Sequence, residues 1–421
     1  MIEDEQGDAI AAALTTLARE DRGRVVALLA RRFGDLDLVD DAVQDALVEA
    51  LEHWKLGGIP DNPAAWLLTT ARNRAIDRLR RNASAHRRTI SAAPELVAEQ
   101  DPSADVELMI TDHGEVVDER LRLILLCCHP ALEIDTQVAL TLRLVGGLTT
   151  HEIASAFLLP EPTLAQRIVR GKRKISSARI PLSIPRNIED RIEAVLNVLY
   201  LVFNEGYLSR GDRIMPLRID LMDEAIRLTR VVSNLAPSNP EVLGLLSLEL
   251  FTAARQASRL SPAGDLVLLE QQDRSLWDRD MIHEANNLVT LAISHMKPGQ
   301  FQVQAIIAWH HANSASAADT RWGDIARLYG HLQHMTPSPL ATLNQAVAVS
   351  KIEGAQAGLD LVDGIQGLEK YHLFHATRGE FLLQIGDREE ARSAFRAATE
   401  HTRSPSELAH LGRRIAATEG E

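Results

Sequence analysis

The residues that could do chemistry are charged clusters on predicted helices, and the sign of the charge changes from one helix to the next. The segment from about residue 36 to 56 has an apolar stripe of Val39, Val43, Leu47 and Leu51. Its polar face carries Asp40, Asp41, Gln44, Asp45 and Glu49, with Asp37 at its start. An acidic face of this kind suits docking on a basic protein surface, since complementary charges steer association. A plain solvated face is the alternative interpretation.

The next predicted helix has the opposite charge. A Gly/Pro-rich loop over residues 57–62 precedes it, and Pro63 suits its first turn. Its candidate nucleic-acid contacts are Trp66, Arg72, Asn73, Asp77, Arg80 and Arg81. Arginine contacts phosphates and base edges, and an aromatic ring can stack on an unpaired base. A tryptophan beside such a helix is nevertheless more often part of the core.

A second basic helix follows a predicted capping box. Thr149 and Glu152 have the spacing of that box, and the turn Leu158–Pro162 ends the helix that they begin. The last helix of the segment, from Thr163 to about Ala178, has polar residues that could face DNA: Thr163, Gln166, Arg167, Arg170, Lys172 and Arg173. A helix, a short turn and a basic helix are typical of a helix-turn-helix that reads DNA.

Composition favours an all-α chain of several domains. The chain has 421 residues, too many for one hydrophobic core, and its aromatic content is only 4%. The pattern predicts a helical segment over residues 8–82, a linker over 83–118, a second compact segment over 119–180 and a helical-repeat extension over 186–421. One tetratricopeptide-like helix pair is clearest in the extension, with Gly379, Leu382, Gly386, Ala391, Phe395 and Ala398 at its spacing.

Bulk properties exclude some classes of protein. No run of about 18 apolar residues exists, and the acidic start lacks the pattern of a secretory signal, so we expect a cytoplasmic protein without membrane contact. The net charge of −13 argues against a general nucleic-acid binder. The adjacent Cys127 and Cys128 are expected to be buried thiols rather than a disulfide or a metal site.

An enzyme in the C-terminal half is an alternative that the residues support weakly. His283 and Glu284 lack a second histidine at the spacing of a metalloprotease helix, and no phosphate loop or nucleophile elbow occurs. Adjacent His310 and His311 point to different helix faces. We therefore predict no catalytic residue, no metal and no cofactor, with His331 and His334 as the one pair spaced to share a metal.

Taken together, these motifs resemble a known family. Residues 40–47 (DDAVQDAL) are similar to the polymerase-binding helix of region 2 in sigma-70-type factors, and residues 62–81 to the helix that melts and reads the −10 element. Residues 148–175 resemble region 4, which reads the −35 element. This order matches the extracytoplasmic-function (ECF) subgroup. Residues 127–130 (CCHP) and 200–207 (YLVFNEGY) are similar to the branch with a tetratricopeptide-like extension.

The resemblance implies a role for each cluster. The acidic helix would dock on the β′ clamp helices of core RNA polymerase, and region 4 would meet the β flap. The first basic helix would bind −10 DNA and the second −35 DNA, while the loop over residues 57–62 would hold a flipped base. The entry Pro160-Glu161-Pro162 departs from the Ser/Thr-rich pattern usual in the family, so the −35 sequence is left open.

Two further interpretations remain. A free-standing helix-turn-helix regulator with a repeat sensor would explain the second basic helix and the extension, but it leaves the acidic helix without a role. In a sigma factor, the extension would modulate activity through intramolecular contact with the sigma domains, because repeat arrays present faces to partner domains. The promoter consensus, the inducing signal and the sign of that effect are not readable from the sequence.

Overall fold

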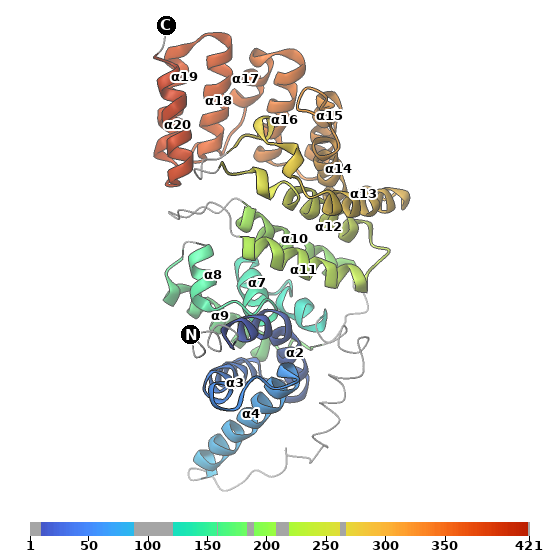
Figure 1. Ribbon diagram of the computed structural model, residues 1–421, viewed down its shortest axis with the longest axis vertical. Coiled ribbons are helices and arrows are strands. Elements are labelled where there is room, and N and C mark those ends of the chain that lie inside the picture. Colours follow the sequence, from blue (N-terminus) through green and yellow to red (C-terminus); the bar gives the residue numbers. More distant parts are fainter. Residues whose placement is uncertain are drawn as a thin grey trace. The chain divides into compact units, whose positions relative to one another are not determined.

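The computed structural model describes residues 10–87, 121–157, 159–182, 189–207, 219–261 and 267–419. It divides into two compact units, Met1–Leu201 and Val202–Glu421. The predicted all-α class is confirmed, because the described ranges form helices, turns and loops without a β-strand (Figure 1). No helix in these ranges has both the length and the apolar character needed to cross a membrane.

The first unit holds the three charged helices. Its labelled elements are η1 (Leu17–Asp21), α2 (Arg22–Phe33), α3 (Leu36–Gly57), α4 (Pro63–Arg87), α7 (Ile134–Leu140), η2 (Thr141–Val145), α8 (Thr150–Ala156), α9 (Glu161–Ser177) and α10 (Glu189–Tyr207), the last of which continues into the second unit. α2 ends at Gly34, whose φ of 69° is left-handed. α3 begins at once because the Asp35 carboxylate accepts the backbone N–H of Asp37 at 2.9 Å.

The packing of α3 on α4 corrects one prediction. Leu51, which was expected in the buried stripe, is 44% exposed. The nearby Val48 is also exposed, at 51%. The buried line instead follows Val39 and Val43 with a row of small side chains, Ala42, Ala46 and Ala50. Alanine lets two helix backbones approach closely, so α3 is rotated to place its alanines, rather than Leu51, on the buried side, where Ala42 packs with Ala75 of α4.

The predicted linker lies largely outside the described residues. α4 continues to Arg87, past the predicted end of the first segment at Asn82. The sequence also predicts a short helix near residues 106–111, and this range lies outside the described residues.

The two cysteines are buried, as predicted. Cys127 and Cys128 are 0% and 1% exposed, and the Cys128 thiol lies 3.5 Å from the Thr141 hydroxyl. Burial raises the pKa of Cys127 well above its usual value and that of Cys128 to about 12. Neither thiol is therefore a nucleophile at neutral pH.

The second unit is a succession of helices in which each packs against its neighbours (Figure 1). They are α11 (Ile219–Leu235), α12 (Pro240–Ala253), α13 (Arg279–Ser294), α14 (Gln300–Ala312), α15 (Trp322–Met335), α16 (Pro339–Glu353), α17 (Ala355–Asp363), α18 (His372–Ile385), α19 (Arg388–Glu400) and α20 (Pro405–Ala417), with short 3₁₀ turns η3 (Gln256–Ser258), η4 (Leu269–Gln271) and η5 (Arg274–Leu276).

The predicted repeat unit near the C-terminus is the pair α18 and α19. A Cβ added at Gly379 would lie 2.7 Å from the ring of Phe395, so only glycine lets the two helices cross this closely. Gly386 ends α18 with a φ of 92°. Ala391, Phe395 and Ala398 are buried between the helices. Small residues at the crossing thus have the structural role that their spacing predicted.

A buried carboxyl in α12 makes the stability of the second unit depend on pH. Glu249 is 0% exposed, and the Thr229 hydroxyl donates a hydrogen bond to its carboxyl at 3.1 Å. Burial raises the pKa of Glu249 well above its usual value. A raised folded-state pKa means that the unfolded chain loses this proton first as pH rises. We therefore expect Glu249 by itself to lower the free energy of unfolding by about 1.4 kcal/mol per pH unit from about pH 4.5 up to its folded-state pKa.

Urea denaturation from pH 4.5 to 8 checks this expectation. Glu249→Gln removes the ionisable group, so its stability should be flatter with pH and greater than that of the parent at pH 7. Glu353→Gln, at an exposed carboxylate in α16, is the control and should behave like the parent. Parallel pH profiles for the parent and Glu249→Gln would contradict the assignment.

Candidate functional site

Three carboxylates of the acidic cluster on α3 are paired with arginines of α4. Arg78 binds both Asp41 and Asp45 at 2.6 Å, and Arg74 binds Glu49 at 2.7 Å. These carboxylates stay partly open to solvent, with side-chain exposures of 59%, 43% and 27% for Asp41, Asp45 and Glu49. Exposed pairs of this kind contribute little to stability, so a competing cation can replace the arginines at small cost.

Asp40 is separated from the rest of this acidic cluster. It is 4% exposed and binds three cations: Arg22 of α2, Arg143 of η2 at 3.3 Å and Lys172 of α9 at 3.0 Å. Burial works to raise the pKa of Asp40, but the three cations together hold it below its usual value. Gln44 also turns to this side, since its amide oxygen accepts from Arg143 at 3.3 Å. The structure thus splits the predicted protein-docking set in two.

The candidate nucleic-acid residues of α4 also divide. Trp66, Asn73, Asp77 and Arg80 recur at helical spacing on one face, where Trp66 is half-buried and the other three are exposed. Arg81 is exposed as well, and it donates to the Asp77 carbonyl at 3.3 Å. Arg72 lies apart from them, because it is only 8% exposed.

Trp66 has one buried and one open side. Its ring packs edge-on against Trp54 of α3, with centroids 5.7 Å apart, and lies 6.4 Å from the ring of His53. Trp54 is 2% exposed, so its packed ring restrains the Trp66 ring on the buried side. A rigid, half-open indole can offer its free face to an unstacked base.

The helix-turn-helix forms as predicted. The Thr149 hydroxyl accepts the N–H of Glu152 at 3.1 Å, and the Glu152 carboxylate accepts that of Thr149 at 2.7 Å, which completes the capping box. The second helix, α9, begins at Glu161 rather than Thr163, with Pro162 in its first turn.

Four of the predicted DNA-binding residues of α9 form one exposed stripe. They are Thr163, Gln166, Arg170 and Arg173. Arg167 is half-buried and pairs with Asp135 at 3.2 Å. Lys172 lies on a different face, is 6% exposed and points to α3, where it contacts Asp37 at 2.9 Å and Asp40. Charge alone grouped Lys172 with the stripe, whereas packing separates it.

Sequence reasoning missed two arginines and two apolar residues of this site. Arg22 and Arg143 hold Asp40, but nothing in the sequence marks them as partners of a carboxylate so far along the chain. Val48 and Leu51 add an exposed apolar strip next to Glu49. The alanine row of α3 is the signal that could have found this strip, since it shows which face is buried.

The histidines of the second unit give no metal site in the ranges that the structure describes. Burial lowers the pKa of His311 to about 3, so its ring is neutral at pH 7, and it packs against Trp322 with centroids 5.3 Å apart. His334 contacts the Gly330 carbonyl at 2.7 Å. These contacts indicate that His311 and His334 have packing and hydrogen-bonding roles within the helical unit.

Comparison with known families finds matches along most of this architecture. Residues 17–85 match the family described as Sigma-70 region 2, and residues 122–175 match Sigma-70 region 4. Residues 191–293 match a family described as of unknown function, DUF6596. The order of the matches is the order of α2–α4, α7–α9 and the helices that follow.

Individual relatives agree with these matches. An uncharacterized protein of Rhizobium meliloti is 41% identical over 93% of this chain and 92% of its own length. The probable ECF RNA polymerase sigma factor SigI of Mycobacterium tuberculosis is 28% identical over 39% of this chain and 55% of its own length. SigK of a Mycobacterium species, also an ECF sigma factor, is 27% identical over 39% of this chain and 82% of its own length. A solved P58(IPK) TPR domain covers 91% of this chain and 96% of its own, at 13% identity, but with a TM-score of only 0.27.

The family matches, their order and the helices that carry them agree with one another. A region 2 bundle with an acidic α3 and a basic α4 precedes a region 4 helix-turn-helix, and a second helical unit follows. The chain belongs to the extracytoplasmic-function subgroup of sigma-70-type RNA polymerase sigma factors, in which it carries a C-terminal helical extension.

Proposed function

We propose that this sigma factor binds core RNA polymerase through α3 and directs it to promoters whose −10 and −35 elements are read by α4 and α9. The observation that carries the proposal is the stripe of Thr163, Gln166, Arg170 and Arg173 on α9, the second helix of a capped helix-turn-helix. Such a helix enters the major groove, where arginine and glutamine can form paired hydrogen bonds with base edges.

The −10 surface would be the face of α4 with Trp66, Asn73, Asp77 and Arg80. Arg80 would contact phosphate, while Asn73 and Asp77 offer polar groups to a base edge. Arg72 lies inside the bundle, so its role would be to position α4 rather than to touch DNA.

The polymerase-docking surface would combine Asp41, Asp45 and Glu49 with the apolar Val48 and Leu51. An interface usually has an apolar centre with a polar rim, and α3 offers both on neighbouring faces. The basic clamp helices of β′ are the partner whose charge fits. In docking, their cations would replace Arg74 and Arg78, which pair with these carboxylates in the free chain.

The extension would regulate these domains. The first compact unit runs to Leu201 and includes most of α10, in which Arg191 lies close enough to Cys128 and His129 to affect their pKa values. A version without the extension should therefore retain α10 and end at Tyr207 rather than near Ile180.

Run-off transcription with core polymerase tests the function. Templates are the DNA upstream of the protein's own gene and of neighbouring operons. We expect discrete transcripts that need the full-length protein and that are lost with Arg170→Ala/Arg173→Ala. The version ending at Tyr207 then reports whether the extension activates or restrains. No transcript and no core binding, together with tight binding of a specific duplex by the protein alone, would favour the free-standing regulator.

Exposed Leu51 provides a sharper test of the docking surface. We expect Leu51→Ser to weaken binding of core polymerase about tenfold, since losing a central apolar contact commonly costs more than 1 kcal/mol. Thermal stability should change little because the side chain is 44% exposed. Ile352→Ser, at a comparably exposed residue of α16, is the matched control and should leave core affinity unchanged. Equal affinities for the two variants would remove Leu51 from the interface.

A further inference from the structure

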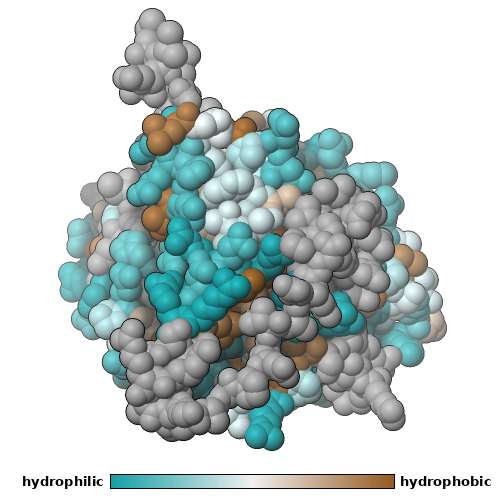
Figure 2. Space-filling view, turned by 90° about the horizontal axis from the view of Figure 1, so that it is seen from below, coloured by the Kyte–Doolittle hydropathy of each residue, from teal (hydrophilic) through white to brown (hydrophobic). Residues whose placement is uncertain are grey.

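Two residues predicted from the sequence to bind partners, Asp40 for polymerase and Lys172 for DNA, bind one another in this structure. Asp40 of α3 and Lys172 of α9 are 4% and 6% exposed, and the Lys172 ammonium lies 3.0 Å from the Asp40 carboxylate. Neither group can reach an outside partner while this contact persists. Where Figure 2 is coloured, the surface is largely hydrophilic, with its hydrophobic residues in small separate groups.

The contact is one part of a cluster that joins region 2 to region 4. From region 2 come Asp37, Asp40 and Gln44 of α3 with Arg22 of α2; from region 4 come Arg143 and Lys172. The Arg22 guanidinium binds both Asp40 and the Arg143 carbonyl, so it contacts both regions. Buried ion pairs are weakly screened by salt, and every carboxylate of this cluster has a cationic partner.

The backbones also meet in a way that depends on one glycine. A Cβ added at Gly23 of α2 would lie 2.4 Å from the Val145 carbonyl oxygen of η2. No side chain fits this space, so any residue other than glycine would force the two regions apart. The contact is therefore close at the level of the main chain as well as in its charges.

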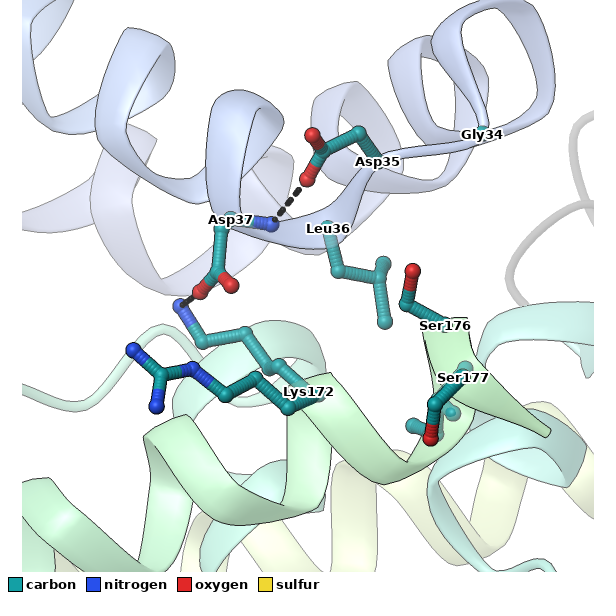
Figure 3. Close-up of a pocket in the computed structure, with 9 residues that line it drawn as sticks. Gly34, Asp35, Leu36, Asp37, Lys172, Ser176 and Ser177 are labelled. Atoms are coloured by element: carbon teal, nitrogen blue, oxygen red, sulfur yellow. Dashed lines mark hydrogen bonds and ion pairs between the residues drawn. The ribbon is translucent and has the colours of Figure 1, made fainter. Parts of the chain in front are cut away.

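A groove borders the cluster on the other side of Lys172. Figure 3 shows it between the start of α3 and the C-terminal half of α9, where Asp37 faces Lys172 and Leu36 lies opposite Ser176, while Asp35 accepts the backbone N–H of Asp37. Its volume is about 400 Å³. The two regions thus pack closely at Asp40 and Gly23, whereas a groove separates them at Ser176. This groove gives α9 space to move relative to α3.

We propose that region 4 is held on region 2 by the Asp40 cluster and the Gly23 contact as an autoinhibitory clasp, which must open before α3 can use Asp40 on polymerase and α9 can use Lys172 on DNA. This rests on the proposed function. A closed form of this kind lowers the apparent affinity for polymerase in proportion to the fraction of molecules that are open.

The clasp can be opened sterically without changing its charges. Gly23→Ala in the full-length protein inserts a methyl group against Val145, while alanine is itself the better helix former. Gly412→Ala in α20 is the matched control, because an added Cβ there has nothing within 4 Å. Lys172→Gln is a second, independent variant that removes one counter-ion of Asp40 and leaves α2 untouched.

Two measurements report on each protein. Core polymerase binding is titrated with fluorescently labelled full-length chain. Separately, spin labels on Glu52→Cys and Lys174→Cys, two exposed positions in region 2 and region 4, give the distance distribution between the regions. The native thiols are buried with raised pKa values, so labelling is confined to the introduced cysteines.

We expect Gly23→Ala to add a population with longer label separations and to tighten core binding about tenfold. Lys172→Gln should change both in the same direction, and Gly412→Ala should match the parent. Identical distances and affinities for all four proteins would overturn the clasp, as would longer separations without tighter core binding. If Gly23→Ala loses its helical circular dichroism, Lys172→Gln alone decides between these results. Absence of core binding by every protein, including those whose labels separate, would instead overturn the proposed function and the clasp with it.

Discussion

We expect replacement of Arg22 by alanine to lower the free energy of unfolding of the first unit by about 3–5 kcal/mol, because it leaves a buried carboxylate with an incomplete set of partners. The Arg22 side chain is 1% exposed and binds Asp40 and the Arg143 carbonyl. Burial lowers the pKa of Arg22 to about 10, so the guanidinium remains charged at neutral pH. Hydrogen–deuterium exchange of α2 and α3 peptides across a urea series measures this unit separately from the second.

Two further proteins show whether the loss comes from the unpaired charge. Arg31→Ala removes an exposed arginine from the same helix and should stay within about 0.5 kcal/mol of the parent. The double variant Arg22→Met/Asp40→Leu removes both charges but leaves Lys172 with Asp37 as its carboxylate partner, so it should recover only part of the stability lost in Arg22→Ala. If Arg22→Ala and Arg31→Ala were equally mild, the Asp40 cluster would have no role in stability.

In the second unit, we expect Phe395→Ala to cost about 3–5 kcal/mol of unfolding free energy. Phe395 is 0% exposed and fills the crossing of α18 and α19 opposite Gly379, with Leu382, Ala398 and Leu411 in the same cluster. Neighbouring helices of a repeat array stabilise one another, so the loss should spread to α17 and α20. Exchange of peptides from these helices in urea is the measurement.

Phe374→Ala is the matched control for this substitution. Phe374 lies on α18, where it is only partly buried against the same cluster. Its truncation removes the same atoms but leaves less of a cavity, so we expect less than half the effect of Phe395→Ala. Equal losses would mean that the crossing at Gly379 is not the centre of this core.

Local features of the chain were predictable because short-range chemistry determines them. The start of α8 follows from Thr149 and Glu152, whose side chains satisfy the first backbone N–H groups of that helix. The end of α18 follows from Gly386, which adopts a φ that other residues avoid. The charge of each helix likewise depends on residues that are close in sequence. The assignment to regions 2 and 4 follows from the same residues.

The sequence by itself therefore determined the all-α class, the helix-turn-helix, the repeat pair at α18 and α19, and the charge of each functional helix. Only the tertiary structure decided which charged residues stay available. Leu51 turns outward because the alanines of α3 meet α4, and Lys172 turns inward because Asp40 lies opposite it. Rotation of a helix about its axis and pairing across more than a hundred residues depend on the whole packed unit, since no local pattern records which distant partner will neutralise a buried charge.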